Sequence, residues 1–261
     1  MRILITNDDG ISAPGLKIAE AIARDLAGPT GEVWVVAPAF EQSGVGHCVS
    51  YVRPMRLELL EDRRYAVEGS PADCVLAGLF EILKSSPPDL ILSGVNRGHN
   101  VAEDVLYSGT IGGAMEGALH GIKSIALSQY FGPENRNSKA PFANAAAHGA
   151  DVCRKLLTRA DWSAGPYSTF YNVNFPPCAP SKIKGVRAAF QGRRQVPTFE
   201  VEHQTSPNGR NYLWLSGGRG NETAQSGSDA RETMENWIAV TPLRADLTAH
   251  DHLKGLGDAL G

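Results

Sequence analysis

Short hydrophobic runs alternate with helix-like stretches along the first 160 residues of the chain. The runs at 3–6, 32–37, 89–93 and 124–128 are almost continuously apolar, which is typical of strands buried on both faces. Helices are predicted between and after them, over 14–28, 70–84, 108–120 and 140–158. Strands and helices that alternate in this way predict an α/β fold, with helices on both faces of a parallel sheet.

Helix-capping residues support several of these boundaries. Ser70 stands where an N-cap is needed, with Pro71 at the first helical position and an acidic residue at the third. Pro141 is expected within the first turn of the helix over 140–158, and Gly121 is expected to end the helix before it. The predicted order of elements therefore depends on local signals as well as on periodicity.

The pattern changes after about residue 168. Strand-like segments over 168–175, 185–190, 211–216 and 237–242 are separated by Gly, Pro and polar residues, without a clear helix between them. We expect an antiparallel, β-rich extension, and one domain over 1–261 that consists of a core over 1–180 and this extension over 181–261. The polar, Gly-rich segment 217–229 is either a plain loop or a loop that borders an active site.

Composition narrows the class of protein. A formal net charge of −3 argues against a polymeric nucleic-acid partner, which would favour a basic face. Four cysteines, without C-x-x-C pairs or zinc-finger spacing to histidine, predict reduced structural thiols. The N-terminal apolar run is too short for a signal peptide, and no apolar stretch reaches the roughly 18 residues of a membrane span. We therefore expect a cytoplasmic protein without a membrane partner.

Two adjacent carboxylates, Asp8 and Asp9, follow the first predicted strand. Ligands of open parallel sheets bind at the carboxyl ends of the strands, so this position is a candidate site. One aspartate could cap the next helix, but the second would then only add repulsion. A divalent cation such as Mg²⁺ or Mn²⁺ would neutralise both groups.

Further oxygen donors follow the next two strands. Ser43 and Gly44 stand in the loop after the second strand, and Asn96 and Asn100 are expected in the loop after the run at 89–93. Each loop alone could be an ordinary tight turn. Because all these loops are predicted at the same edge of one sheet, together they indicate a site.

A predicted helix begins just after Tyr107, at Ser108-Gly109-Thr110. Backbone N–H groups at a helix N-terminus favour anions. The hydroxyl groups could simply cap the helix, or this turn could bind phosphate. The adjacent Gly109 favours the phosphate site.

Missing motifs narrow the chemistry. Position 7 is Asn, so the D-x-D-G pattern of aspartyl-phosphate phosphatases is not present. Neither a G-x-S-x-G elbow, an H-E-x-x-H helix nor a P-loop occurs, and no G-x-G-x-x-G of a dehydrogenase follows the first strand. Direct attack of a metal-activated water on phosphorus remains the simplest mechanism.

An ordered set of motifs resembles the SurE (survival protein E) family of metal-dependent 5′/3′-nucleotidases. NDDG at 7–10, QSG at 42–44, SGVNRGHN at 93–100 and YSGT at 107–110 carry the resemblance in the first half of the chain. GSPADC, NVNFP, GSD and VTPLRADLTAH follow in family order, at 69–74, 172–176, 227–229 and 240–250. NDDG alone is a weak signal, but the whole set is highly specific.

The resemblance implies a Rossmann-like three-layer core and a β-rich C-terminal part that mediates oligomerisation, here a homodimer or homotetramer. It implies hydrolysis of nucleoside monophosphates, with 3′-nucleotides and short polyphosphate as additional substrates of some members. One divalent ion per subunit, Mg²⁺ or Mn²⁺, would be held by the positions that match the family ligands: Asp8, Asp9, Ser43 and Asn96.

The same resemblance leads to a hypothesis about roles. Asp8 or Asp9 would accept the proton of the attacking water. Asp104 would support the surrounding loops, with Asn100 beside it. The residues expected to bind the phosphoryl group or the substrate are Asn7, Gly44, Asn100, Ser108, Gly109 and Thr110.

Two features depart from the family pattern, and one rival class remains. Arg97 stands at a variable family position and could contact phosphate or lie solvated at the rim. The segment 45–52 contains fewer Ser and Thr than the family pattern, which leaves the role of His47 open. The alternative function that remains is that of a metal-gated nucleotide or phosphate sensor, which would bind its ligand without turnover.

Overall fold

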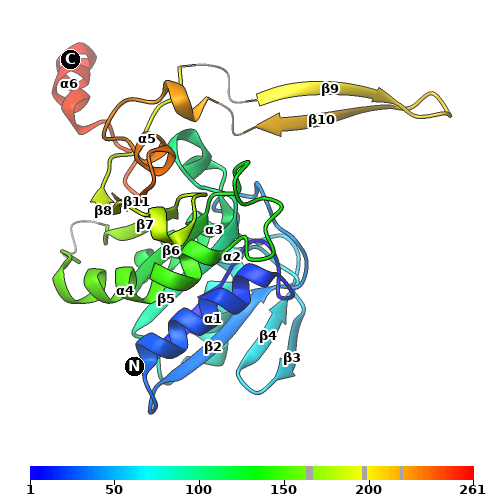
Figure 1. The fold of residues 1–261 in the computed structure, drawn as a ribbon, viewed down its shortest axis with the longest axis vertical. Helices are drawn as coiled ribbons and strands as arrows, with labels where there is room; N and C mark the ends of the chain where they lie inside the picture. Colours follow the sequence, from blue (N-terminus) through cyan, green and yellow to red (C-terminus); the bar gives the residue numbers. More distant parts are fainter. Residues whose placement is uncertain (163–166, 196–198, 218–219) are drawn as a thin grey trace.

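The computed structural model describes residues 1–162, 167–195, 199–217 and 220–261. Nine described strands form one sheet in the order β3-β4-β2-β1-β5-β6-β7-β11-β8 (Figure 1). Six of them, from β4 to β7, run parallel to their neighbours. The bounds are β1 (Arg2–Thr6), β2 (Glu32–Pro38), β3 (Leu57–Glu61), β4 (Arg64–Val67), β5 (Leu90–Arg97), β6 (Lys123–Gln129), β7 (Phe170–Phe175), β8 (Gly185–Ala188) and β11 (Trp237–Leu243).

Helices cover both faces of this sheet. The main helices are α1 (Pro14–Ala27), α2 (Pro71–Ala77), α3 (Gly109–Leu119) and α4 (Ala143–Arg159). On one face α1 packs beside α4, and on the other α2 packs beside α3. Successive β1 residues point to opposite faces: Ile3 belongs to the core beneath α1, whereas Leu4 packs with Val75 of α2. These three layers confirm the α/β fold.

Two helix predictions need correction. The segment 70–84 is not one regular helix, because α2 ends at Ala77 and a wider π-helical turn (Gly78–Ile82) follows. Its predicted start holds: Ser70 and Asp73 form a capping box. Pro141 lies before α4 and not inside its first turn, since its carbonyl accepts a hydrogen bond from Asn135 Nδ2 at 3.0 Å and the helix begins only at Ala143.

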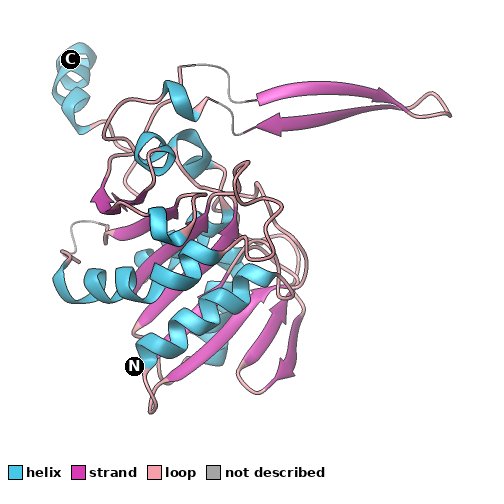
Figure 2. Cartoon of the chain, viewed as in Figure 1, coloured by secondary structure: helices cyan, strands magenta, loops and turns pink. Residues whose placement is uncertain are grey.

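The C-terminal part is only partly an antiparallel extension. Strand β7, expected to begin it, continues the parallel sheet, and only β11 pairs antiparallel to β7. The prediction missed β9 (Phe199–Thr205), which pairs with β10 (Asn211–Gly217) in a hairpin that projects from the body (Figure 2). The edge pair of β3 and β4 was missed as well. All residues of β3 and β9 are exposed, so these strands carry no continuous apolar run, and β4 is only four residues long.

Short helical segments connect the remaining elements. They are η2 (Ala102–Leu106), η3 (Pro180–Lys182), η4 (Asn221–Thr223), α5 (Asp229–Met234), η5 (His250–His252) and α6 (Leu253–Leu260). None of these was predicted. No helix in the described part of the chain combines the length and apolarity needed to cross a bilayer.

Candidate active site

The carboxyl ends of three adjacent strands bring the paired acids and the other oxygen donors together. Asp8 and Asp9 follow β1, which lies between β2 and β5 in the sheet. Ser43 follows β2, and Asn96 lies near the end of β5. The prediction placed Asn96 and Arg97 in a loop, but β5 continues through both of them after a register shift. Their position at the sheet edge is as expected.

Asp8 is a buried carboxylate held by the start of α3. Thr110 donates to it twice, from Oγ1 to Oδ1 at 2.6 Å and from its backbone N–H to Oδ2 at 3.1 Å. Burial raises the pKa of Asp8 to about 6, opposed by the Thr110 hydroxyl and reinforced by the charge of Asp9. An ionised Asp8 is therefore costly in the protein alone.

The pKa of Asp9 is also raised above its ordinary value. Burial raises its pKa, while the Arg97 backbone N–H, which donates to Oδ2 at 2.9 Å, lowers it. The negative charge of Glu41 raises it further. Glu41 also accepts a hydrogen bond from the Ser43 hydroxyl at 3.0 Å. Sequence reasoning overlooked Glu41, although it stands two residues before Ser43 in the loop already considered.

The donor set fits a hard divalent cation. Two desolvated carboxylates lie beside a hydroxyl and a carboxamide, and all of these offer oxygen ligands. The amide nitrogen of Asn96 donates to the Gly98 carbonyl at 3.1 Å, which leaves its carbonyl oxygen as a donor to a metal. The Oδ1 atom of buried Asn7 also has no hydrogen-bond partner among the described residues. Across those residues, no three His, Cys, Asp or Glu side chains form a metal cluster, so the site would be of mixed oxygen type.

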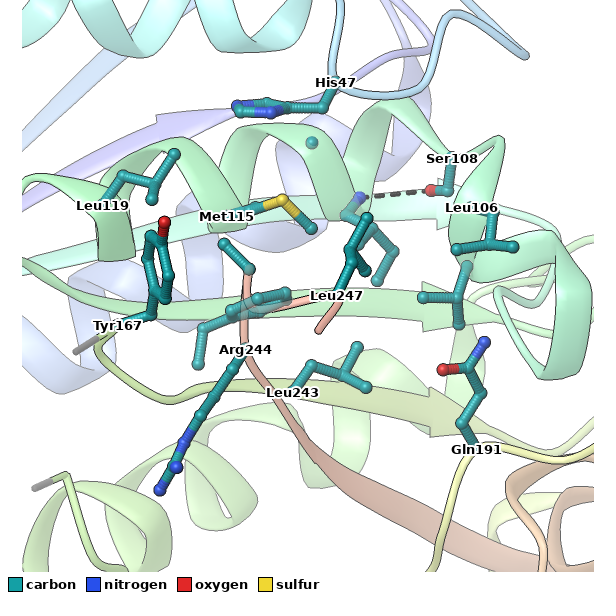
Figure 3. A pocket seen from close by; sticks show the side chains of 15 residues that line it. His47, Leu106, Ser108, Met115, Leu119, Tyr167, Gln191, Leu243, Arg244 and Leu247 are labelled. Atoms are coloured by element: carbon teal, nitrogen blue, oxygen red, sulfur yellow. Dashed lines mark hydrogen bonds between the residues drawn. The ribbon is translucent and has the colours of Figure 1, made fainter. Parts of the chain in front are cut away.

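The first turn of α3 lies against Asp8. Ser108 is the N-cap, and its hydroxyl accepts from the Ile111 N–H at 3.1 Å (Figure 3), which leaves its own O–H as a donor. A Cβ on Gly109 would lie 2.8 Å from the Cβ of Asp8, so only glycine allows this approach. Both hydroxyls of the predicted phosphate turn are thus engaged within the protein, Ser108 as a cap and Thr110 on Asp8.

Asn100 is buried and links the site to β6 and β7. Its backbone N–H donates to Asn174 Oδ1 and its Nδ2 to Ser128, both at 2.8 Å. Asn172 and Asn174 donate back to its carbonyl. These two asparagines belong to the NVNFP segment, so this motif supports the loop that contains Asn100.

An ion pair with the buried Arg194 supports Asp104. Both nitrogens at the end of the Arg194 side chain donate to its carboxylate, at 2.9 and 2.6 Å, and the Arg194 side chain has no exposed surface. Arg194 also donates to Asn221, which contacts His99 at 2.8 Å. Burial lowers the pKa of His99 to about 4, so it is neutral at pH 7. Arg194 carried no sequence signal, because its partner Asp104 is 90 positions away in the chain, whereas His99 lies within the SGVNRGHN motif but was given no role.

The segment 217–229 borders the site, which was one of the two alternatives that the sequence left open for it. Gly217 lines the cavity that contains Asp8 and Ser43, and Asn221 binds Arg194. Residues 218–219 of this segment lie outside the described residues. The cavity has a volume of about 320 Å³, and Gly44, at its edge, adopts the left-handed conformation with φ of +79°.

A separate apolar cavity of about 430 Å³ adjoins the N-terminus of α3 (Figure 3). Leu106, Met115 and Leu247 are among its lining side chains, and none of the described residues that line it is a carboxylate. His47 at its edge contacts Glu116 of α3, with Nε2 and Oε2 2.5 Å apart. His47 therefore connects the segment after Ser43 to α3.

Arg97 lies at the rim of the site. Its guanidinium carbon is 5.6 Å from the centre of the Phe131 ring.

Comparisons with known proteins agree with this geometry. The family model described as "Survival protein SurE" matches residues 3–198. A protein of Cereibacter sphaeroides named "5'-nucleotidase SurE" is 57% identical over 100% of both chains, and one of the same name from Roseobacter denitrificans is 57% identical over 98% of both. The crystal structure of a SurE protein from Aquifex aeolicus covers 100% of both chains with a TM-score of 0.81 and 35% identity. The resemblance of the motifs is thereby confirmed, and the chain belongs to the SurE family.

Proposed function

We propose that this chain is a 5′-nucleotidase that releases phosphate from nucleoside 5′-monophosphates. The observation that carries the proposal is the pair of Asp8 and Asp9 at the sheet edge, where the buried Asp8 is held by the N-terminus of α3 and the half-buried Asp9 by the backbone of Arg97 on β5. The full-length relatives named as 5′-nucleotidases support it. Such a pair of acids is suited to bind a cation, and the helix N-terminus beside it is suited to bind phosphate.

The residues that would hold one divalent ion per subunit, Mg²⁺ or Mn²⁺, are Asp8, Asp9, Ser43 and Asn96. When bound, such an ion supplies an activated water and neutralises charge on the phosphoryl oxygens. Its binding would also offset the burial of the two carboxylates, whose pKa values are both raised. Chelation would accordingly abolish activity.

The remaining steps, proton transfer and orientation of the phosphoryl group, would depend on side chains and backbone groups of the protein. Thr110 donates a hydrogen bond to each carboxylate oxygen of Asp8. Among the described residues, Asp9 accepts a hydrogen bond only at Oδ2, so its Oδ1 is free of such a bond. Asp9 is therefore the better candidate to accept the proton of the attacking water. The Ser108 hydroxyl and the backbone at Gly44 and Gly109 would orient the phosphoryl oxygens. Asn7 would contribute its unpartnered Oδ1 at the site or to the substrate.

Two further residues, Asn100 and Asp104, would hold the loops around the site in place. Asn100 would hold the loop after β5 in place through its bonds to β6 and β7. Asp104 would do the same through its pair with Arg194. We further propose one structural unit over 1–261, with a core over 1–180 and an extension over 181–261 that forms a homodimer or homotetramer.

The test is phosphate release from 5′- and 3′-nucleoside monophosphates and a short polyphosphate, with Mn²⁺, with Mg²⁺ and with EDTA. We expect metal-dependent multiple turnover with 5′-nucleotides. Release from the other two substrates would show whether this chain shares the broader activities that the family resemblance implies. A folded protein that binds Mn²⁺ and nucleotide but releases no phosphate would be the sensor instead.

A further inference from the structure

We propose that the rings of Tyr107 and Phe199 form the platform on which the base of the nucleotide stacks. The proposal deepens the proposed 5′-nucleotidase function and rests on it. Both side chains line the same cavity as Asp8, Ser43 and Asn96. The cavity volume of about 320 Å³ lies within the range of small-molecule sites.

The two rings are close to each other and open to solvent. Their centroids are 5.4 Å apart with an interplanar angle of 80°, an edge-to-face pair. Tyr107 is 47% exposed and Phe199 45% exposed. Exposed aromatic faces in a groove that also binds phosphate are the usual stacking platform for bases, since every base has a π-face.

The backbone of Tyr107 is fixed relative to the phosphate end of the cavity. Its carbonyl accepts from the Gly46 N–H at 2.8 Å, and its N–H donates to the Asp104 carbonyl at 3.1 Å. The next residue, Ser108, is the N-cap of α3. A ring carried on this backbone is preorganised with respect to both the Ser43 loop and the helix N-terminus.

The polarity of the cavity matches a nucleoside monophosphate. Its lining combines the oxygen donors Asp8, Ser43 and Asn96 with the two aromatic rings. Phe199 begins β9 and Gly217 ends β10, so the base of the projecting hairpin contributes part of this lining. The hairpin would thus take part in substrate selection.

A second cavity beside Asp9 also contains aromatic side chains, but their faces are already covered. There Phe131 packs edge-to-face on Phe142 at 5.0 Å, and the Arg97 guanidinium lies over Phe131. Ser108 lines the Tyr107 cavity and is not among the residues that line this second one. The exposed pair is therefore the better stacking surface.

The experiment compares adenosine 5′-monophosphate with ribose 5-phosphate, which has the same phosphate and sugar but no base. In Tyr107→Ala we expect KM for the nucleotide to rise about 10- to 100-fold, equivalent to about 1.4–2.8 kcal/mol, with little change in kcat. KM for ribose 5-phosphate should stay within about twofold of the wild type, because the removed contact is to the base alone. Tyr107→Phe should retain the nucleotide preference.

Phe131→Leu is the matched control, an aromatic replacement in the second cavity, and it should leave the ratio of the two KM values unchanged. The proposal is overturned if Tyr107→Ala leaves the ratio of KM for the nucleotide to KM for ribose 5-phosphate unchanged, or if Phe131→Leu raises that ratio instead. Titration calorimetry of the same two compounds gives the comparison without turnover. A wild type that binds the nucleotide through Tyr107 but releases no phosphate would refute the nucleotidase and not the platform.

Discussion

Asp8 is the residue on which the proposed chemistry depends most. Replacing Asp8 by Asn removes one anionic ligand, while the amide oxygen can still accept a hydrogen bond from Thr110. We expect metal-dependent phosphate release to fall by more than about 100-fold, the scale of losing a principal electrostatic group. Circular dichroism should show an unchanged fold, and Mn²⁺ titration should show weaker binding.

Asp62→Asn is the control for charge removal, since the Asp62 side chain is 94% exposed and remote from the sheet edge that carries the acids. Its activity and Mn²⁺ affinity should equal those of the wild type. Normal turnover with normal metal affinity in Asp8→Asn would rule out the assignment of Asp8 as a ligand.

Asp229 is a second buried acid, and it should make stability depend on pH. It accepts backbone N–H groups of Gly192 at 2.8 Å and Ala230 at 2.7 Å, yet burial raises its pKa from 3.8 to about 6. Between these two values the folded protein binds the proton more readily than the unfolded chain. The contribution of Asp229 to the free energy of unfolding therefore increases as pH falls from 7 to 5, by about 1 kcal/mol.

Urea denaturation of the wild type and Asp229→Asn at both pH values isolates this contribution, since the other titrating groups are shared. The difference in unfolding free energy, wild type minus variant, should be larger at pH 5 than at pH 7. A difference that does not change with pH would show that Asp229 does not titrate in this range.

At the scale of elements, the position of α3 against β1 determines the site. In Gly109→Ala, the new Cβ would lie 2.8 Å from the Cβ of Asp8 and 3.1 Å from Pro71. Helix propensity alone favours Ala by about 1 kcal/mol, but the contact must displace either the helix or the carboxylate. We expect kcat/KM to fall by about 100-fold, the typical effect of a displacement near 1 Å.

Gly257→Ala is the matched control in α6, where a Cβ would meet no atom of the described residues within 4 Å. This variant should keep full activity in the same phosphate-release assay. If Gly109→Ala is also fully active, the close packing of α3 against Asp8 is not required for the reaction.

A second contact between elements joins the C-terminal part to η2. In Arg194→Met, the partly exposed carboxylate of Asp104 would lose its charged hydrogen-bond donor, and we expect a loss of about 1.5–3 kcal/mol in the free energy of unfolding. Arg154→Met on α4 is the control, because its pairs with Asp25 and Asp151 are exposed and worth less than about 1 kcal/mol. Similar losses in the two variants by urea denaturation would contradict the structural role of Arg194.

At the scale of the whole molecule, the projecting hairpin and α6 expose apolar side chains that one chain leaves uncovered. Trp214 is 63% exposed and Leu215 72% exposed on β10, and Leu260 of α6 is 80% exposed. Such surfaces favour association with a second copy. Light scattering should give a mass of two or four times 27.9 kDa.

Replacing Trp214 and Leu215 by Lys should lower that mass, because the apolar surface of β10 is lost. Asn208→Lys at the hairpin turn adds a similar charge without removing apolar surface, and it should leave the mass unchanged. A monomeric wild type would contradict self-association, and an unchanged mass in the double variant would contradict the role of β10.

Much of the architecture could be predicted from local pattern alone. The runs that became β1, β2, β5 and β6 bury side chains on both faces, and this leaves a clear apolar signature. The paired acids at 8–9, the capping box at Ser70 and the ordered motifs are also local in the chain. They were sufficient to predict the α/β class, the edge of the sheet that carries the candidate site, and the family.

Tertiary structure alone decided the contacts between distant segments. The pair of Asp104 and Arg194 spans 90 positions in the chain, and the contact of Tyr107 with Phe199 spans slightly more. Periodicity describes which face of an element is buried, but it does not say which partner covers that face. In the hairpin, β10 was predicted but β9 was not, because a strand without a buried face has little hydrophobic pattern. The sequence by itself thus determined the sheet edge and its oxygen donors, while only the folded chain decided what surrounds them.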